Sequence, residues 1–413
     1  MRFKNKIETI LTKLNQLLLP LEFNCDLNKD RYALLSGDSL FSGNLGLVIY
    51  HYYYSKVTGN NQSKERATEL LQNIIERVDE EKTSLGNYTL SYGIAGLGYV
   101  LNHLVNEDFI EYSGQEIEKI NELIYEWALE MIENDDSEFM HGAFGAILYL
   151  SKNRVTPKIE FYLSNLIEKL TKQANHTNDG IYFDFFNKLV PEYPKGTINL
   201  SLSHGLCGIL LILIDLLKKK LIKSETKTLV IDGIKFLESN LSPVDFSQKI
   251  YCFSDSVIFE DRLEKRNTRL AWCYGDLNPA LVFLKAGELF KNERYTEIGN
   301  EIALTTLNRK DYEQTFIKDS QFCHGTSGLV QVYHRIYQMT GNDSYLKGRD
   351  FWIEKTLDYL ENEIDSNYYN KDNKTGELLE GLAGVGLVLL STLSIDNQED
   401  LLWDELFLLS STD

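Results

Sequence analysis

Proline is scarce in this sequence, with six residues in a chain of 413. Because proline ends or bends a helix, its scarcity leaves room for many uninterrupted helices. Positive charge is also in the minority, since 42 lysines and arginines stand against 61 aspartates and glutamates, for a formal net charge of −19. A nucleic-acid-binding protein of the usual kind is therefore excluded, because it would need a basic face to neutralise phosphates.

We expect no secretory signal, and long apolar runs are missing as well. Glu8, Lys13 and Asn15 interrupt the N-terminal segment where a signal peptide would need an apolar core. The most apolar stretches, residues 205–217 and 378–393, are shorter than the roughly 20 residues that cross a membrane. The cysteines are five in number and widely scattered, so we expect no disulfide framework and a cytoplasmic location.

A short glycine motif, in contrast, recurs along the whole chain. It consists of a glycine, two other residues, a second glycine and an apolar run, and its first glycines are 49 to 70 residues apart. Each repeat therefore has room for two helices and two connections. A further copy begins at Gly275, where Asn278 and Pro279 replace the second glycine. The regular copies begin at Gly43, Gly93, Gly142, Gly205, Gly325 and Gly381.

Two kinds of helix alternate between these motifs. Residues 7–18 and 70–78 carry apolar side chains at a spacing of three and four, which predicts helices with one wet face. Residues 209–217 and 385–393, which follow a motif, are apolar nearly all round and are predicted to be buried. We therefore predict an all-α fold, in which a single domain over residues 1–413 closes seven outer and inner helix pairs into an α/α toroid.

In such a toroid the inner helices all begin at the same end, so the residues just before the glycine motifs converge on one mouth. Each of these residues is polar or carries a hydroxyl group. Buried helices do not need such a set for stability, which favours a functional pocket at this mouth. Helix capping is the alternative, above all for the first residue of the set. The set consists of Ser42, Tyr92, His141, His204, Tyr274, His324 and Glu380.

Three of the motifs carry residues with strong chemistry: Ser203-His204-Gly205, Trp272-Cys273-Tyr274-Gly275 and Cys323-His324-Gly325. In this order they resemble the lanthionine synthetase C-like family, the lantibiotic cyclases. The resemblance covers the whole chain, because that family is also a seven-pair α/α toroid of about this length. It implies that Cys273, Cys323 and His324 bind one catalytic Zn²⁺. Two thiolates and one imidazole are a normal catalytic set that leaves a fourth position open.

The resemblance implies an intramolecular Michael-type addition. A cysteine of a dehydrated precursor peptide binds the open zinc position, its thiol pKa falls, and the thiolate attacks the β-carbon of dehydroalanine or dehydrobutyrine. The product is a lanthionine or methyllanthionine thioether ring. The enolate formed by the attack must be stabilised and then protonated at its α-carbon, which requires a cationic or hydrogen-bonding group and a general acid.

Four more side chains gain roles from the resemblance. His204 corresponds to the family's acid–base histidine. Arg269, four residues before Cys273, stabilises the enolate or anchors an acidic partner, and Tyr274 places a hydroxyl near the metal or orients a neighbouring group. The family's catalytic aspartate lies four residues before the glycine of the third repeat, where this chain has Glu138.

The acid in the third repeat has several candidates. Glutamate moves the carboxylate outward by about one methylene, a displacement that matters in an active site. Either Glu138 replaces the aspartate, or Asp135 or Asp136 takes its place. His141 adds an imidazole beside this carboxylate, as a general acid, a ligand or a cap.

One segment departs from the repeat. Residues 240–267, between the fourth and fifth repeats, lose the helical period and gain β-branched and aromatic residues, so we predict an irregular insertion with short strands. The family carries an extension near this place, and the segment is either a peptide-holding element or a solvated loop. The implied partners are a dehydrated precursor peptide, and a dehydratase and an ABC exporter in a membrane-associated complex.

The sequence alone leaves two alternative functions possible. A LanC-like zinc protein that binds a small thiol such as glutathione, or acts as a scaffold, has the same motifs without cyclising a peptide. The second is a metal-free toroid that acts on sugars through paired carboxylates, for example Glu138 and Glu380. That function predicts no zinc and tolerance to the loss of Cys323.

Overall fold

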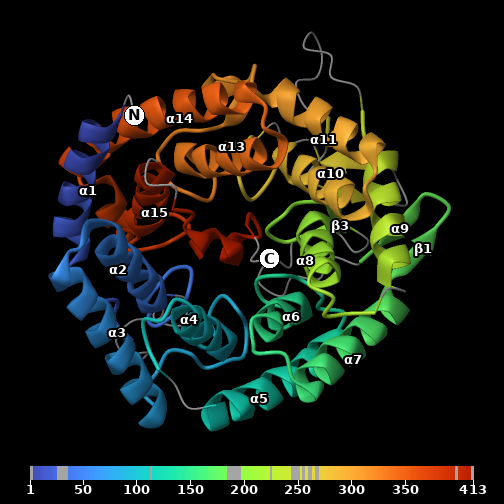
Figure 1. Ribbon diagram of the computed structural model, residues 1–413, viewed down its shortest axis with the longest axis horizontal. Helices are drawn as coiled ribbons and strands as arrows, with labels where there is room; N and C mark the ends of the chain where they lie inside the picture. The colour runs from blue at the N-terminus through green and yellow to red at the C-terminus, as the bar shows by residue number, and fades with distance from the viewer. Residues whose placement is uncertain are drawn as a thin grey trace. The chain divides into compact units, whose positions relative to one another are not determined.

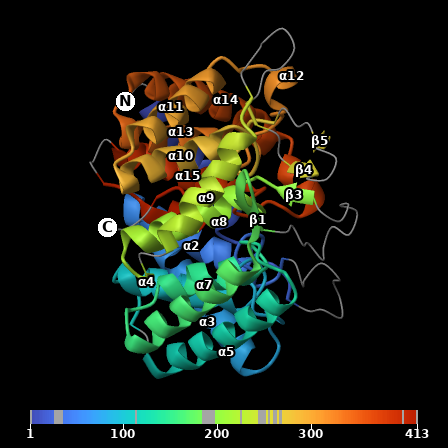
Figure 2. The ribbon, with the colours of Figure 1, turned by 90° about the vertical axis from the view of Figure 1, so that its right-hand side faces the viewer.

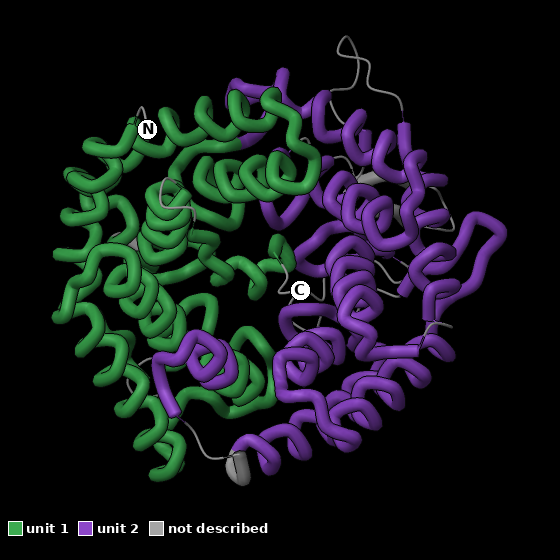
Figure 3. Tube along the Cα trace, viewed as in Figure 1, with its two compact units in different colours: residues 1–100, 317–412 green, residues 101–316, 413 purple. Residues whose placement is uncertain are grey.

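The computed structural model describes residues 3–25, 36–111, 114–183, 197–223, 226–242, 252–253, 256–258, 263–265, 269–395 and 399–410. The chain divides into two compact units (Figure 3). The first unit consists of residues 1–100 and 317–412, and the second consists of residues 101–316 with residue 413. The single domain predicted from the sequence stays a prediction. Among the described residues, no helix is both long and apolar enough to cross a membrane.

The first unit has two layers of helices (Figure 1). The helix α15 contacts both α2 and α13, and these three form the buried layer. Three amphipathic helices cover them, with α3 packed on α2, α14 on α13 and α1 on α15. The bounds are α1 (Lys4–Leu18), α2 (Asn44–Thr58), α3 (Asn61–Asp79), α13 (Thr326–Thr340), α14 (Asp343–Asp365) and α15 (Leu382–Ser394), with the 3-10 helices η2 (Tyr368–Asp372) and η4 (Leu402–Phe407).

The second unit repeats this arrangement. Its buried helices α6, α8 and α10 contact one another in series, and amphipathic helices lie against them. The bounds are α5 (Gly114–Glu133), α6 (Ala143–Ser151), α7 (Pro157–Gln173), α8 (Leu206–Lys218), α9 (Thr226–Ser239), α10 (Leu277–Phe290), α11 (Glu293–Thr306) and the short α12 (Tyr312–Thr315). The helix α4 (Ile94–Asn106) begins in the first unit and ends in the second.

The two kinds of helix follow from the sequence as predicted. On α1 the buried face consists of residues at three-and-four spacing, from Ile7 to Leu18, whereas α8 is buried on nearly all sides from Leu206 to Leu217. The partners are also clear, because each of α2, α10 and α13 packs on the outer helix that follows it in the chain. In the described part of the chain no outer helix follows α15, and α15 packs on α1 instead.

Close backbone approach explains why the motifs need glycine. A Cβ atom at Gly205 would lie 2.3 Å from the carbonyl oxygen of Asn199, and one at Gly208 would lie 2.1 Å from that of Leu202. Any side chain at either position would collide with the turn that leads into α8. The turn therefore folds tightly over the start of the buried helix, and this places His204 at the N-terminal end of α8.

Short strands lie on both sides of α8 in the sequence. The hairpin of β1 (Asn175–Thr177) and β2 (Gly180–Tyr182) was not expected, and it packs on α9. A second sheet joins β3 (Thr197–Asn199), β4 (Ser256–Ile258) and β5 (Leu263–Lys265) in antiparallel order, side by side in Figure 2. The strands β4 and β5 fall within the predicted insertion, as expected. The remainder of that segment, residues 243–251, 254–255, 259–262 and 266–267, lies outside the described residues.

Candidate active site

Glu138 and His204 meet in the second unit. Glu138 lies in the turn before α6, and His204 lies in the turn before α8. The Nδ1 atom of His204 is 2.5 Å from Oε1 of Glu138. The carboxylate side chain is 5% exposed and the imidazole 24%, so a substrate can reach the histidine while the carboxylate stays shielded. The structure thus brings together two of the residues that the sequence proposed for acid–base chemistry.

Their electrostatics favour a carboxylate and an imidazolium. Burial raises the pKa of Glu138, but the positive charges and hydrogen bonds of His141 and His204 hold that pKa well below its usual range. Burial lowers the pKa of His204, but the charge and hydrogen bond of Glu138 raise it above its usual value. The raised pKa favours the protonated imidazole, which is the state that a general acid needs.

The second carboxylate oxygen of Glu138 accepts a hydrogen bond within the turn that carries Glu138 itself. The backbone N–H of His141 donates to Oε2 over 2.5 Å, and Nδ1 of His141 is 3.2 Å from the same oxygen. The imidazole rings of His141 and His204 are nearly parallel, with centroids 5.8 Å apart. The carboxylate that meets His204 is therefore that of Glu138. Asp135 occupies a left-handed turn position, at φ 57°, and the buried Asp136 follows it.

The turn that carries His204 is tied to the turn that carries Cys273. The backbone N–H and the hydroxyl of Ser203 both donate to the carbonyl of Cys273, each over 3.3 Å. The amide of Asn278 accepts from the Leu202 N–H at 3.0 Å and donates to the Trp272 carbonyl at 2.7 Å. Asn278 replaces the second glycine in the degenerate motif, and the departure from the repeat is the signal in the sequence that marks this residue.

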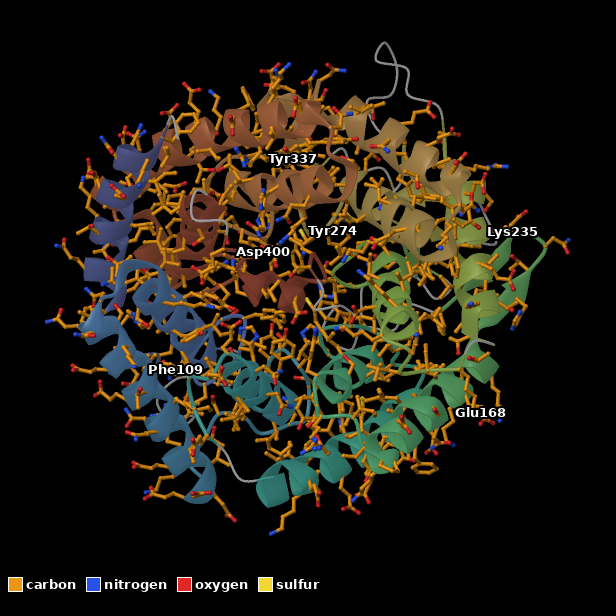
Figure 4. The ribbon with its side chains drawn as sticks, in the orientation of Figure 1. Phe109, Glu168, Lys235, Tyr274, Tyr337 and Asp400 are labelled. Atoms are coloured by element: carbon orange, nitrogen blue, oxygen red, sulfur yellow. The ribbon has the colours of Figure 1, made fainter. Side chains whose placement is uncertain are left out.

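Tyr274 lies on the same side as His204. Its hydroxyl accepts a hydrogen bond from the Asn199 amide over 3.3 Å, and its ring centroid is 6.5 Å from that of His204. Figure 4 shows Tyr274 on the side of the buried helices, whereas Glu168 on α7 and Lys235 on α9 lie at the outer face of this unit. The placement is consistent with a hydroxyl near the reacting groups.

A buried ion pair supports the turn from behind. Asp276 is fully buried and accepts from Nη1 of Arg309 at 3.2 Å. Its carboxylate also accepts from the backbone N–H groups of Cys252 and Phe253, at distances between 2.9 and 3.1 Å. Part of the insertion is thereby held next to Gly275. The sequence carries no local signal for this contact, because the partners are 23 to 33 residues apart.

The predicted zinc ligands belong to both units. Cys273 is buried in the turn before α10 of the second unit, and Cys323 and His324 are partly buried in the turn before α13 of the first. Neither cysteine forms a disulfide. Two thiols and an imidazole are a donor set that suits zinc. All three stand in a turn at the start of a buried helix. Burial raises the pKa of the other thiols, that of Cys252 to about 12, which is typical of cysteines used for packing.

The turn of Cys323 is well supported within the first unit. The Cys323 N–H donates to the Leu379 carbonyl over 2.8 Å. The preceding Phe322 packs on the C-terminal segment, with ring centroids 4.4 Å from Phe407 and 5.5 Å from Trp403. These contacts hold the Cys323-His324 turn against the core.

The other predicted residues are placed as follows. Arg269 is partly buried at the start of the turn that carries Cys273, and its carbonyl lies over Gly275, where a Cβ atom would be 2.3 Å away. Gly275 has φ +110°, which a residue with a side chain rarely adopts. Glu380 forms an ion pair with Lys374 in the first unit. The catalytic roles of Arg269 and Tyr274 stay predictions.

Comparisons with known proteins agree with one another. A family model described as "Lanthionine synthetase C-like protein" matches residues 36–408. "Nisin biosynthesis protein NisC" of Lactococcus lactis subsp. lactis is 25% identical over 349 residues, which are 77% of this chain and 78% of that protein. The solved structure "Nisin cyclase" has a TM-score of 0.73 and 18% identity, and covers 99% of this chain and 98% of its own. The helices and this likeness confirm the predicted fold class, an all-α chain of the α/α toroid type.

Proposed function

Because the chain belongs to the lanthionine synthetase C-like family, we propose that it is a zinc-dependent cyclase of a dehydrated precursor peptide. It adds cysteine thiolates of that peptide to dehydroalanine or dehydrobutyrine and forms lanthionine or methyllanthionine. The Glu138–His204 pair carries the proposal, because it places an imidazole against a buried carboxylate at a turn tied to Cys273. The similarity to a nisin biosynthesis protein supports the choice of substrate class.

One Zn²⁺ per chain is assigned to Cys273, Cys323 and His324. When bound, the metal lowers the pKa of a peptide thiol in its open position, so that the thiolate is available at neutral pH. The cysteines supply the soft ligands that zinc prefers. The hydrogen bonds of Ser203 to the Cys273 carbonyl and of Cys323 to the Leu379 carbonyl hold the backbone at both thiols.

His204 is the proton donor in this mechanism. As the C–S bond forms at the β-carbon, the π electrons of the double bond move to the carbonyl oxygen and leave an enolate. Nδ1 of His204 is held by Glu138, so Nε2 is the nitrogen that protonates the α-carbon. The thiol proton has left to solvent, and the imidazole regains one from solvent, so one thiol adds to one double bond overall.

Two further side chains are assigned to the enolate. Arg269 places a guanidinium at the same turn, where it stabilises the negative charge on the oxygen. Tyr274, whose hydroxyl is held by Asn199, provides a hydrogen bond beside His204. The chain acts in the cytoplasm on a precursor peptide, together with a dehydratase and an ABC exporter. The net charge of −19 favours a cationic peptide.

Metal content and ring formation test this function together. Zinc is measured by mass spectrometry in the untagged chain and in Cys323→Ala, both as purified and with no zinc added, with Cys25→Ala as the control for loss of a thiol outside the ligand set. Both proteins are then given a dehydrated, cysteine-containing precursor peptide, and its remaining free thiols are counted after alkylation. We expect about one zinc per chain and thioether formation in the wild type and in Cys25→Ala, and neither in Cys323→Ala.

Two outcomes would contradict the proposal in different ways. Full zinc content in Cys323→Ala as purified, before any zinc is added, would refute the ligand set. One zinc per chain without any loss of peptide thiols would refute the cyclase and favour a zinc protein that binds a small thiol.

A further inference from the structure

We propose that Glu138, His141 and His204 form a second site for a divalent transition-metal ion, and that excess zinc at this site inhibits the enzyme. One ligand atom from each of the three side chains lies within 4.8 Å of the others. The inhibition rests on the function proposed above, but the binding of the metal does not.

The geometry is that of a three-donor site in which one carboxylate faces two imidazole nitrogens. Oε1 of Glu138 is 2.5 Å from Nδ1 of His204, and Oε2 is 3.2 Å from Nδ1 of His141. Both imidazoles thus direct the same nitrogen toward one carboxylate, with their rings within 9° of parallel. A divalent ion that takes the place of protons on the two Nδ1 atoms would meet two imidazole nitrogens and a carboxylate oxygen. That donor set suits Zn²⁺ and Co²⁺, and leaves a position for water.

The donors are both fixed and accessible. Glu138 is held by the backbone N–H of His141, and the backbone N–H of His204 donates to the Ser201 hydroxyl over 3.2 Å. The two turns precede α6 and α8, which pack on each other. The imidazoles remain partly exposed, 15% for His141 and 24% for His204. An ion from solvent can therefore reach a site whose backbone is already in place.

Occupation would remove the groups that the proposed reaction needs. A metal on Nδ1 of His204 replaces the imidazolium by a neutral imidazole, whose Nε2–H is a much weaker acid toward the α-carbon. The Glu138 carboxylate would bind the metal at the same time and would no longer accept from His204. The zinc site proposed at Cys273, Cys323 and His324 shares no ligand with the second site, so it would keep its own ion. The enzyme would then need one zinc and be inhibited by more, and His141 is the side chain that completes the second site.

Metal binding is tested in chains that lack Cys323, one of the three ligands proposed for the first zinc site (Cys273, Cys323 and His324). Zn²⁺ is titrated calorimetrically into Cys323→Ala and into Cys323→Ala/His141→Phe, and Co²⁺ is titrated while its visible spectrum is recorded. We expect one Zn²⁺ per Cys323→Ala chain, with affinity lowered about tenfold or more by His141→Phe, and Co²⁺ bands that this substitution removes. His176→Phe, which changes an exposed histidine of the same unit, is the matched control. Equal affinity with and without His141 would overturn the site.

Inhibition is tested in chains with an intact first site. The rate of thioether formation is measured against added zinc, each variant relative to its own rate with one equivalent. We expect half-inhibition of His141→Phe to require about ten times more zinc than that of the wild type or His176→Phe. Identical inhibition curves would overturn the inhibitory role. Absence of any reaction at one equivalent would instead count against the cyclase function, and the calorimetric result would stand independently.

Discussion

At the scale of single residues, the length of Glu138 has a visible use. One oxygen reaches His204 on the neighbouring turn, while the other accepts from the backbone N–H of His141. Glutamate therefore bridges the starts of α6 and α8 and satisfies its own turn with the same carboxylate. The two imidazoles lower the pKa of this group against the effect of burial, and Glu138 in return raises the pKa of His204.

The substitution Glu138→Gln tests this coupling. Glutamine keeps the size and the hydrogen-bonding oxygen but removes the negative charge that raises the pKa of His204, so that pKa should fall. His204 is protonated below its pKa, so a raised pKa keeps the proton donor charged to higher pH. The limb of the pH–rate profile that declines as pH rises should therefore shift to lower pH in the variant.

The measurement is an NMR titration of the His204 ring beside the pH–rate profile. Glu138→Asp is the control, because it retains the charge at a shorter reach. An unchanged His204 pKa in Glu138→Gln would show that the carboxylate does not hold the proton.

At the scale of elements, the turns before buried helices carry the chemistry and need a scaffold. Asn278 joins the turn of His204 to the turn of Cys273 through Leu202 and Trp272. Asp276 and Arg309 form a buried ion pair beneath the second turn and hold two backbone N–H groups of the insertion. These polar groups are buried, so their loss leaves partners unsatisfied.

Asn278→Ala should loosen the two turns without touching the reacting groups. We expect a loss of about 1–3 kcal/mol in the free energy of unfolding, because a buried N–H and a buried carbonyl each lose a partner. We also expect kcat to fall about tenfold or more with a smaller change in KM, because His204 is no longer fixed relative to Cys273.

Chemical denaturation and steady-state kinetics check both effects. Asn362→Ala, at an exposed amide on α14, should change either quantity little. A destabilised Asn278→Ala with unchanged kcat would contradict a positioning role.

At the scale of the whole molecule, the two ends of the repeat depend on each other. The first helix, α1, supplies the outer partner of the last buried helix, α15. Its buried side chains run from Ile7 to Leu18. Residues at opposite ends of the chain thus belong to one core.

Deletion of residues 1–19 tests this dependence. Burying each large apolar side chain of α1 contributes about 1.5–3 kcal/mol, and together these contributions match the whole stability of an ordinary domain, about 5–15 kcal/mol. We expect the cooperative unfolding transition of the first unit to be lost in calorimetry. As a control, Lys4→Ala/Glu8→Ala on the exposed face of α1 should keep it. A truncated chain with the wild-type transition would contradict the role of α1 as the cover of α15.

The sequence by itself determined the helices, their two classes and the chemistry available. The spacing of apolar residues, the fully apolar segments and the paired glycines are local properties of the sequence, so they can be recognised without knowledge of tertiary contacts. The side chains before each motif could be named for the same reason.

Only the tertiary structure decided which of these groups meet. Three nearby carboxylates were candidates for the family's catalytic aspartate, and the fold of the turn directs that of Glu138 to His204. Asn278, Asp276 and Arg309 act on turns and backbone groups that are distant in sequence. No local pattern encodes such contacts, because they arise only when the helices have packed and brought separate turns together.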